Sequence, residues 1–143
     1  MEQKYLGTGG GLLSVQSLLR NKFMVVNADD LYDKPDLESI IEGHNSSYGI
    51  FLRNARDEKL ETVLFNDDNL LIGREKRELD KNRWVGTGAY MLSKEIFSQK
   101  FYQLHNGEYS IPHTLIKCSF PVYVKKFKNW IPVNTYQDII ASY

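Results

Sequence analysis

Apolar and polar positions along the chain follow two periods in turn, one typical of helices and one typical of strands. Residues 12–19 carry leucine and valine at helical spacing after a glycine-rich turn, which predicts a helix. The segment 23–27, FMVVN, is a continuous apolar run and predicts a fully buried strand. Asp33, Lys34 and Pro35 then predict a helix start, because proline suits the first turn and aspartate suits a cap.

The rest of the chain continues this alternation. Further strands are predicted at 48–54, at 60–65 and 69–75 around a tight turn, at 84–92 and at 121–127. Further helices are predicted at 93–99 with Ser93 as N-cap, around 111–119, and from Thr135. The order of strands and helices predicts a single α/β domain over residues 1–143, with a mostly parallel sheet flanked by helices.

Composition narrows the classes of protein. The 143 residues hold 18 Lys and Arg against 18 Asp and Glu, and this balance argues against a nucleic-acid partner. Cys118 is the single cysteine, which excludes an internal disulfide and fits a reducing compartment. No window approaches the roughly 20 apolar residues of a membrane helix. We therefore expect a cytoplasmic protein with no membrane partner.

The strand predicted at 23–27 ends in two neighbouring carboxylates, Asp29 and Asp30. Ligands of open α/β sheets bind at the carboxyl ends of the strands, where these side chains lie. The pair is either a divalent metal site or a solvated acidic turn, and the local pattern leaves both interpretations open.

A glycine-rich segment, LGTGGGLL at 6–13, precedes the first helix. Such a segment lets the backbone approach a ligand closely and directs free N–H groups toward it. It lacks the spacing of the dinucleotide fingerprint and the Lys-Ser/Thr pair of a P-loop. A plain connection and a ligand cradle both remain open.

The segments 6–19 and 23–33, LGTGGGLLSVQSLL and FMVVNADDLYD, resemble the middle of the sugar-1-phosphate nucleotidyltransferase family. The resemblance continues in the family's order through GREK, TGAYML, GEYSIPHTLIK and WIPVNTYQDI, and so covers nearly the whole chain. It implies a Rossmann-like nucleotidyltransferase fold.

The family transfers a nucleotidyl group from a nucleoside triphosphate to a sugar 1-phosphate and releases pyrophosphate. The resemblance implies Mg²⁺ as cofactor, with Asp29 as its ligand, and catalytic roles for Asp29 and Lys76. The implied nucleotide-binding residues are Thr8, Gly9 and Gly10, and the implied sugar-phosphate-binding residues are Glu75, Lys76, Thr87 and Gly88.

Two departures from the family pattern affect these expectations. The family's N-terminal third, with its G-x-G-x-R loop for the triphosphate, would precede Met1, so we expect a fold truncated at the N-terminus. Pro132 stands where the family supplies a second metal-binding aspartate, and proline has no side-chain ligand atom. Asn134 is the nearby oxygen donor that remains as the second metal ligand.

These departures leave several functions open. The chain is an enzyme or the sugar-phosphate-binding portion of one, a non-catalytic binding or assembly module, or an unrelated α/β binding domain. Without the triphosphate loop, we expect the isolated chain to release little pyrophosphate. Without the N-terminal third, the strand at 23–27 would have an open edge, so we expect a homo-oligomer or a complex with a complementary N-terminal fragment.

Overall fold

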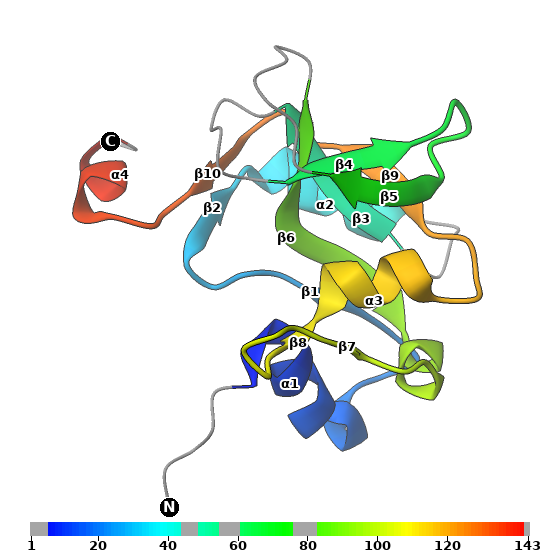
Figure 1. The fold of residues 1–143 in the computed structure, drawn as a ribbon. Coiled ribbons are helices and arrows are strands. Elements are labelled where there is room, and N and C mark those ends of the chain that lie inside the picture. Colours follow the sequence, from blue (N-terminus) through cyan, green and yellow to red (C-terminus); the bar gives the residue numbers. More distant parts are fainter. Residues whose placement is uncertain (1–5, 44–48, 55–60, 76–82, 142–143) are drawn as a thin grey trace, which may run out of the picture.

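The protein is an α/β domain in which helices pack on both faces of one sheet (Figure 1). The computed structural model describes residues 6–43, 49–54, 61–75 and 83–141. None of the helices in these ranges is both long enough and apolar enough to span a bilayer.

The helices and short 3₁₀ helices are α1 (Gly7–Ser14), η1 (Gln16–Leu18), α2 (Lys34–Gly43), η2 (Lys94–Ser98), α3 (Ile111–Lys117) and α4 (Tyr136–Ala141). The strands are β1 (Lys22–Val25), β2 (Asp30–Tyr32), β3 (Gly49–Asn54), β4 (Thr62–Phe65), β5 (Leu71–Glu75), β6 (Trp84–Ser93), β7 (Tyr102–Gln103), β8 (Tyr109–Ser110), β9 (Tyr123–Lys126) and β10 (Trp130–Pro132).

The predicted α/β class is confirmed, but the expectation of a mostly parallel sheet is wrong for the described strands. The main sheet has the order β5-β4-β6-β3-β9, with β1 also paired to β6. Only β3 and β9 pair in parallel. β1, β3 and β9 run in one direction, and β6 runs in the opposite direction between β1 and β3. Strands that pair in parallel need a connection of about a dozen residues or more. The connection between β4 and β5 is shorter, so these two strands pair antiparallel.

Most predicted elements form where the pattern places them. The structure confirms the helix around Pro35, the strand at 49–54, the hairpin of β4 and β5, the long strand β6 and the three elements α3, β9 and α4. Ser93 caps η2 by accepting a hydrogen bond from the Glu95 N–H at 3.3 Å. The ladders β2–β10 and β7–β8 were not predicted, because each is only two or three residues long.

The glycine-rich segment is itself a helix and not a turn before one. α1 begins at Gly7 and ends at Ser14, so the predicted helix at 12–19 starts earlier and stops sooner. Gly9 and Gly10 are buried, and a Cβ on Gly9 would lie 2.8 Å from both Cβ and the carbonyl oxygen of Tyr109. α1 therefore packs against β8 at a distance that only glycine permits at position 9.

β1 lies at an edge of the sheet and is not fully buried, contrary to the sequence prediction. Phe23 and Val25 are half-buried toward the core, whereas Met24 and Val26 are 36% and 39% exposed. β1 pairs with β6 on one side, and within the described ranges its other edge has no strand partner. A purely apolar run indicates burial on both faces, whereas among the described residues β1 is covered on one face only.

Two apolar clusters hold the helices to the sheet. The larger one packs α1 and α3 on one face through Leu12, Ile111 and Leu115. The smaller one packs Ile40 of α2 against Ala89 on the opposite face. In Figure 1, α3 lies in front of the strands and α2 lies behind them. The face covered by α1 and α3 is called the α3 face below.

Substitutions in α1 test this packing. We expect Gly9→Ala to lower the free energy of unfolding by about 1 to 3 kcal/mol, because the added methyl group overpacks the contact with Tyr109. Gly11→Ala is the matched control, since a Cβ at Gly11 would meet no atom within 4 Å. In a helix, this change should raise stability by about 0.5 to 1 kcal/mol. Urea unfolding of both variants measures the difference, and equal effects would contradict the packing of α1 on β8.

Candidate active site

The turn after β1 gives two neighbouring aspartates different environments. The Asp30 carboxylate accepts hydrogen bonds from Asn27 Nδ2 at 3.3 Å, from the Tyr32 hydroxyl at 3.4 Å and from Trp130 Nε1 at 3.1 Å. Asp29 is exposed, and within the described ranges no residue forms a hydrogen bond or ion pair with its side chain. Asp30 therefore holds the local structure together, and Asp29 remains available to a ligand.

Two tyrosines near Asp30 stay protonated. Burial first, and then the Asp30 charge, raise the pKa of Tyr32 far above its ordinary value. The Tyr32 hydroxyl donates to the Thr87 carbonyl at 2.8 Å, which is shorter than its 3.4 Å contact with Asp30. Burial raises the pKa of Tyr90 to about 12. Both hydroxyl groups are therefore protonated at neutral pH.

Glycines in β6 leave part of the α3 face without side chains. Gly86 and Tyr90 pair with β3 residues two positions apart, so both lie on this face. A Cβ at Gly86 would meet no atom within 4 Å, which shows open space above it. Gly88 has a φ of +72°, and a Cβ there would lie 2.2 Å from the Asn27 side chain. We call the stretch from Gly86 to Gly88 the glycine floor.

The predicted sugar-phosphate residues lie in different environments. Gly88 is half-buried in the glycine floor, whereas Thr87 is fully buried, so its hydroxyl lies inside the fold. Glu75 is the last residue of β5, and the predicted Lys76 lies outside the described residues. The Thr87 side chain therefore cannot contact a ligand that binds at the surface.

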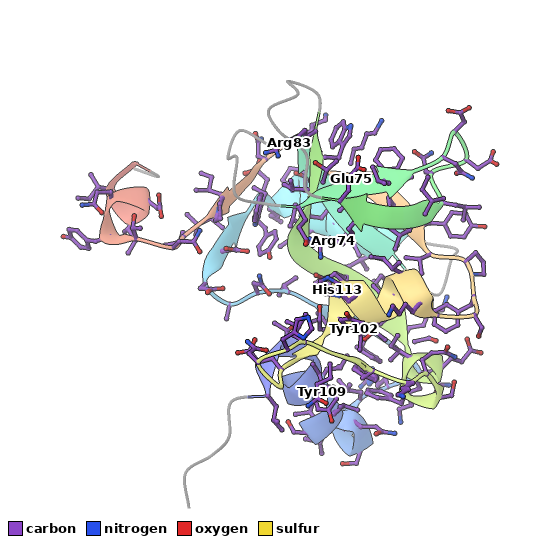
Figure 2. All side chains as sticks on the ribbon, in the orientation of Figure 1. Arg74, Glu75, Arg83, Tyr102, Tyr109 and His113 are labelled. Atoms are coloured by element: carbon purple, nitrogen blue, oxygen red, sulfur yellow. The ribbon has the colours of Figure 1, made fainter. Side chains whose placement is uncertain are left out.

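A polar cluster that the sequence analysis missed lies on the α3 face. Glu61 Oε2 is 3.5 Å from Arg74 Nε and 3.8 Å from His113 Nε2. Figure 2 shows Arg74 extending from β5 toward α3, where His113 stacks on Tyr102 with ring centroids 5.2 Å apart. No motif joins these residues in the sequence, because a hairpin, a helix and a separate strand supply them.

The position of His113 determines its protonation. Burial and the neighbouring Arg74 cation lower the pKa of His113, so the ring is neutral at pH 7. Its Nδ1 lies 2.7 Å from the hydroxyl of Ser110, the N-cap of α3. The Glu61 carboxylate can only accept a hydrogen bond, so the tautomer that fits both neighbours carries its proton on Nε2. His113 thus presents an N–H to Glu61 and accepts from Ser110.

The predicted nucleotide residues divide between two sides of α1. Thr8 and Gly11 line a groove of about 520 Å³ that runs along β1 to Asp29. Gly9 and Gly10 are buried against Tyr109 and Leu6, so their small size serves packing inside the protein. Of the predicted set, the structure brings Thr8 and Asp29 to one groove.

The predicted second metal ligand follows β10. Pro132 pairs with Asp30, and the antiparallel direction then carries the chain toward the turn that holds Asp29. Asn134 is exposed, and its backbone N–H donates to Asp138 at 2.9 Å, at the start of α4. Figure 1 shows α4 projecting from the body of the domain next to β10.

The donor set near this turn fits magnesium. Mg²⁺ is usually bound by one or two carboxylates together with waters and substrate phosphates, and it prefers oxygen ligands. The Asp29 carboxylate is exposed, without a described partner, and the Asn134 amide supplies a second oxygen of the right type. Within the described ranges, no group of three or more His, Cys, Asp or Glu residues is placed to hold a metal ion. A site here would therefore depend on substrate phosphates for much of its coordination.

Comparisons with known proteins give one consistent result. No family model matches the chain. A D-glycero-α-D-manno-heptose 1-phosphate guanylyltransferase of Campylobacter jejuni is 29% identical over 99 residues, which are 68% of this chain and 44% of the guanylyltransferase.

Among solved structures, the inositol-1-phosphate CTP transferase from T. maritima matches with a TM-score of 0.74 at 23% identity, over 93% of this chain and 58% of that one. Apo UDP-glucose pyrophosphorylase matches with a TM-score of 0.78 at 16% identity, over 99% of this chain and 60% of that one.

These matches confirm the resemblance to sugar-1-phosphate nucleotidyltransferases, and they show that the chain has their α/β fold. The chain spans less than half of the curated relative and about three fifths of the solved neighbours.

The different environments of the two aspartates give a testable difference in stability. We expect Asp30→Asn to lower the free energy of unfolding by about 1 to 3 kcal/mol, because three buried or half-buried donors lose a charged acceptor. Asp29→Asn should change it by less than about 0.5 kcal/mol, as for an ordinary surface substitution. Urea unfolding of both variants decides the point, and an equal loss would show that Asp29 also supports the fold.

Proposed function

We propose that this chain is the sugar-phosphate-binding portion of a nucleotidyltransferase that transfers a nucleotidyl group from a nucleoside triphosphate to a sugar 1-phosphate. The observation that carries the proposal is the exposed Asp29 in the turn after β1, whose side chain has no partner among the described residues, in the fold that these enzymes share. The names of the relatives favour this enzyme class over a non-catalytic assembly module.

The reaction defines what the site must provide. An oxygen of the sugar phosphate forms a bond to the α-phosphorus of the triphosphate, while the bond to pyrophosphate breaks and its electron pair leaves with that group. Both reactants are anionic, so the site must bring negative charges together. A magnesium ion, when bound, would neutralise part of the phosphate charge.

The proposed binding sites for the metal and nucleotide and for the sugar lie on two sides of the Asp29 turn. Asp29, with Asn134, would hold magnesium, and the Thr8 side of α1 would face the base and ribose across the groove. The glycine floor would bear the sugar. Glu75, the last residue of β5, lies on the face of the hairpin opposite to Arg74, so its proposed contact with the sugar phosphate would come from that side. Lys76 is proposed to pair with the sugar phosphate as a point charge.

The proposal also assigns a partner to the open edge of β1. The groove along this edge is lined largely by apolar residues, among them Val15, Phe23 and Met24. About two fifths of each solved neighbour lies outside the part that this chain covers. We propose that a complementary N-terminal nucleotidyltransferase segment, or failing that a second copy of this chain, adds a strand here.

A cytoplasmic location belongs to the same proposal. Burial raises the pKa of the Cys118 thiol, whose Sγ donates to the Leu115 carbonyl at 2.9 Å, so the protonated thiol is favoured over the reactive thiolate. Nucleotide-dependent transfer and a single reduced thiol both suit that compartment.

Titration with magnesium tests the assignment of Asp29. We expect Asp29→Asn to weaken Mg²⁺-dependent binding of GTP, CTP or UTP by about tenfold or more, because a carboxylate ligand of the ion is lost. Binding without Mg²⁺ should be unaffected. Asp67→Asn is the control, since Asp67 is an exposed carboxylate in the turn between β4 and β5. Calorimetric titrations that give the two variants the same affinity would remove Asp29 from the metal site.

Sedimentation at micromolar concentration tests the edge of β1. We expect the chain to associate, with itself or with an added N-terminal segment, and Met24→Lys to reduce that association because lysine blocks edge pairing. Ile72→Lys on β5 is the control, since Ile72 is an exposed apolar residue at the other edge of the β4–β5 hairpin. A wild-type monomer with slow amide exchange across residues 23–27 would exclude an open edge.

A further inference from the structure

Glu61 borders the glycine floor. β4 pairs with β6 through Thr62 and Val85, so extending this antiparallel register by one residue places Glu61 opposite Gly86. Side chains alternate along a strand, so Glu61 lies on the same face as Val63, which belongs to the core beneath α3. The carboxylate therefore stands on the α3 face beside the open space above Gly86.

Toward the described residues, the Glu61 carboxylate has unused capacity as an acceptor. Its contacts with Arg74 Nε and His113 Nε2, at 3.5 and 3.8 Å, are longer than the 2.7 to 3.2 Å range of an N–H···O hydrogen bond. An ionised carboxylate offers about four acceptor sites. The side chain is 30% exposed, so these sites face solvent at the edge of the floor.

Neighbouring donors hold this carboxylate in place. Arg74 is only 16% exposed at its side chain, and its Nε has no hydrogen-bond partner within the described ranges, so its charge is directed at Glu61. The His113 ring forms a hydrogen bond with the Ser110 hydroxyl through Nδ1 and stacks on Tyr102. A surface ion pair that served stability alone would not need a neutral histidine and a half-buried arginine around one partly exposed glutamate.

We propose that Glu61 accepts hydrogen bonds from the hydroxyl groups of the sugar phosphate, whose ring lies over Gly86. This inference rests on the proposed function and adds a specificity residue to it. A carboxylate beside a flat, side-chain-free floor suits a polyhydroxylated ring, because adjacent hydroxyls donate to its two oxygens and the ring needs the space that a side chain at position 86 would fill. An anionic group on the ring would instead be repelled by Glu61, so the site selects hydroxyls at this position.

Calorimetric titration with α-D-mannose 1-phosphate, myo-inositol 1-phosphate and inorganic phosphate tests the proposal. We expect Glu61→Gln to weaken the binding of whichever sugar phosphate the wild-type chain binds by about 10- to 100-fold, the loss of a charge-assisted hydrogen bond. Binding of inorganic phosphate, which has no ring hydroxyls, should be unchanged. Glu38→Gln is the control, because Glu38 pairs with Lys34 on α2 and should leave all three affinities unchanged.

A second variant keeps Glu61 and fills the floor. Gly86→Val should fold, since a Cβ there meets no atom within 4 Å, and should exclude both sugar phosphates while inorganic phosphate still binds. If the wild-type chain binds a sugar phosphate and Glu61→Gln binds it with the same affinity, the role of Glu61 is wrong. The proposed function would still stand in that case. Failure of the wild-type chain to bind either sugar phosphate would overturn both.

Discussion

The strand β6 sets the constraint on which the rest of the structure depends. It pairs with β3 along most of its length, with β1 near its end and with β4 near its start, so it fixes the position of three other strands. The same strand carries Gly86, which leaves open space on the α3 face, and Gly88, against which the Asn27 side chain packs. One ten-residue segment must therefore supply both the centre of the sheet and the floor of the candidate site. A larger side chain at position 86 would fill the floor of the candidate site.

Neighbouring residues of the same type have separate functions around this strand. Asp30 joins the β1–β2 turn to β10 through Trp130, while Asp29 next to it points into solvent without a described partner. Gly9 lets α1 pack on β8, whereas Gly11 lines the groove along β1. In each pair the fold uses one residue and leaves the other for a ligand. Such a division keeps the ligand-facing groups free of structural hydrogen bonds that a substrate would have to replace.

The polar cluster on the α3 face also combines residues that support the fold with one that can face a ligand. Glu61 and Arg74 come from the β4–β5 hairpin, and His113 comes from the first turn of α3. The hairpin and the helix are rigid elements, so the carboxylate is held before any ligand arrives. A preorganised acceptor costs less conformational entropy on binding than a flexible side chain would. This is a physical reason to place a specificity residue at this point of the fold.

The sequence by itself determined the local helices and strands and pointed to Asp29 as a candidate site residue. Pro35 and Ser93 mark helix starts through short-range effects, and the run at 23–27 with Asp29 identifies a strand that is followed by an exposed carboxylate. Tertiary structure alone decided that Asp30 is structural, that Thr87 is buried and that Glu61, Arg74 and His113 meet. The reason is the range of the forces involved. Caps, turns and periodicity act within a few residues, whereas hydrogen-bond partners and burial depend on strands brought together from distant parts of the chain.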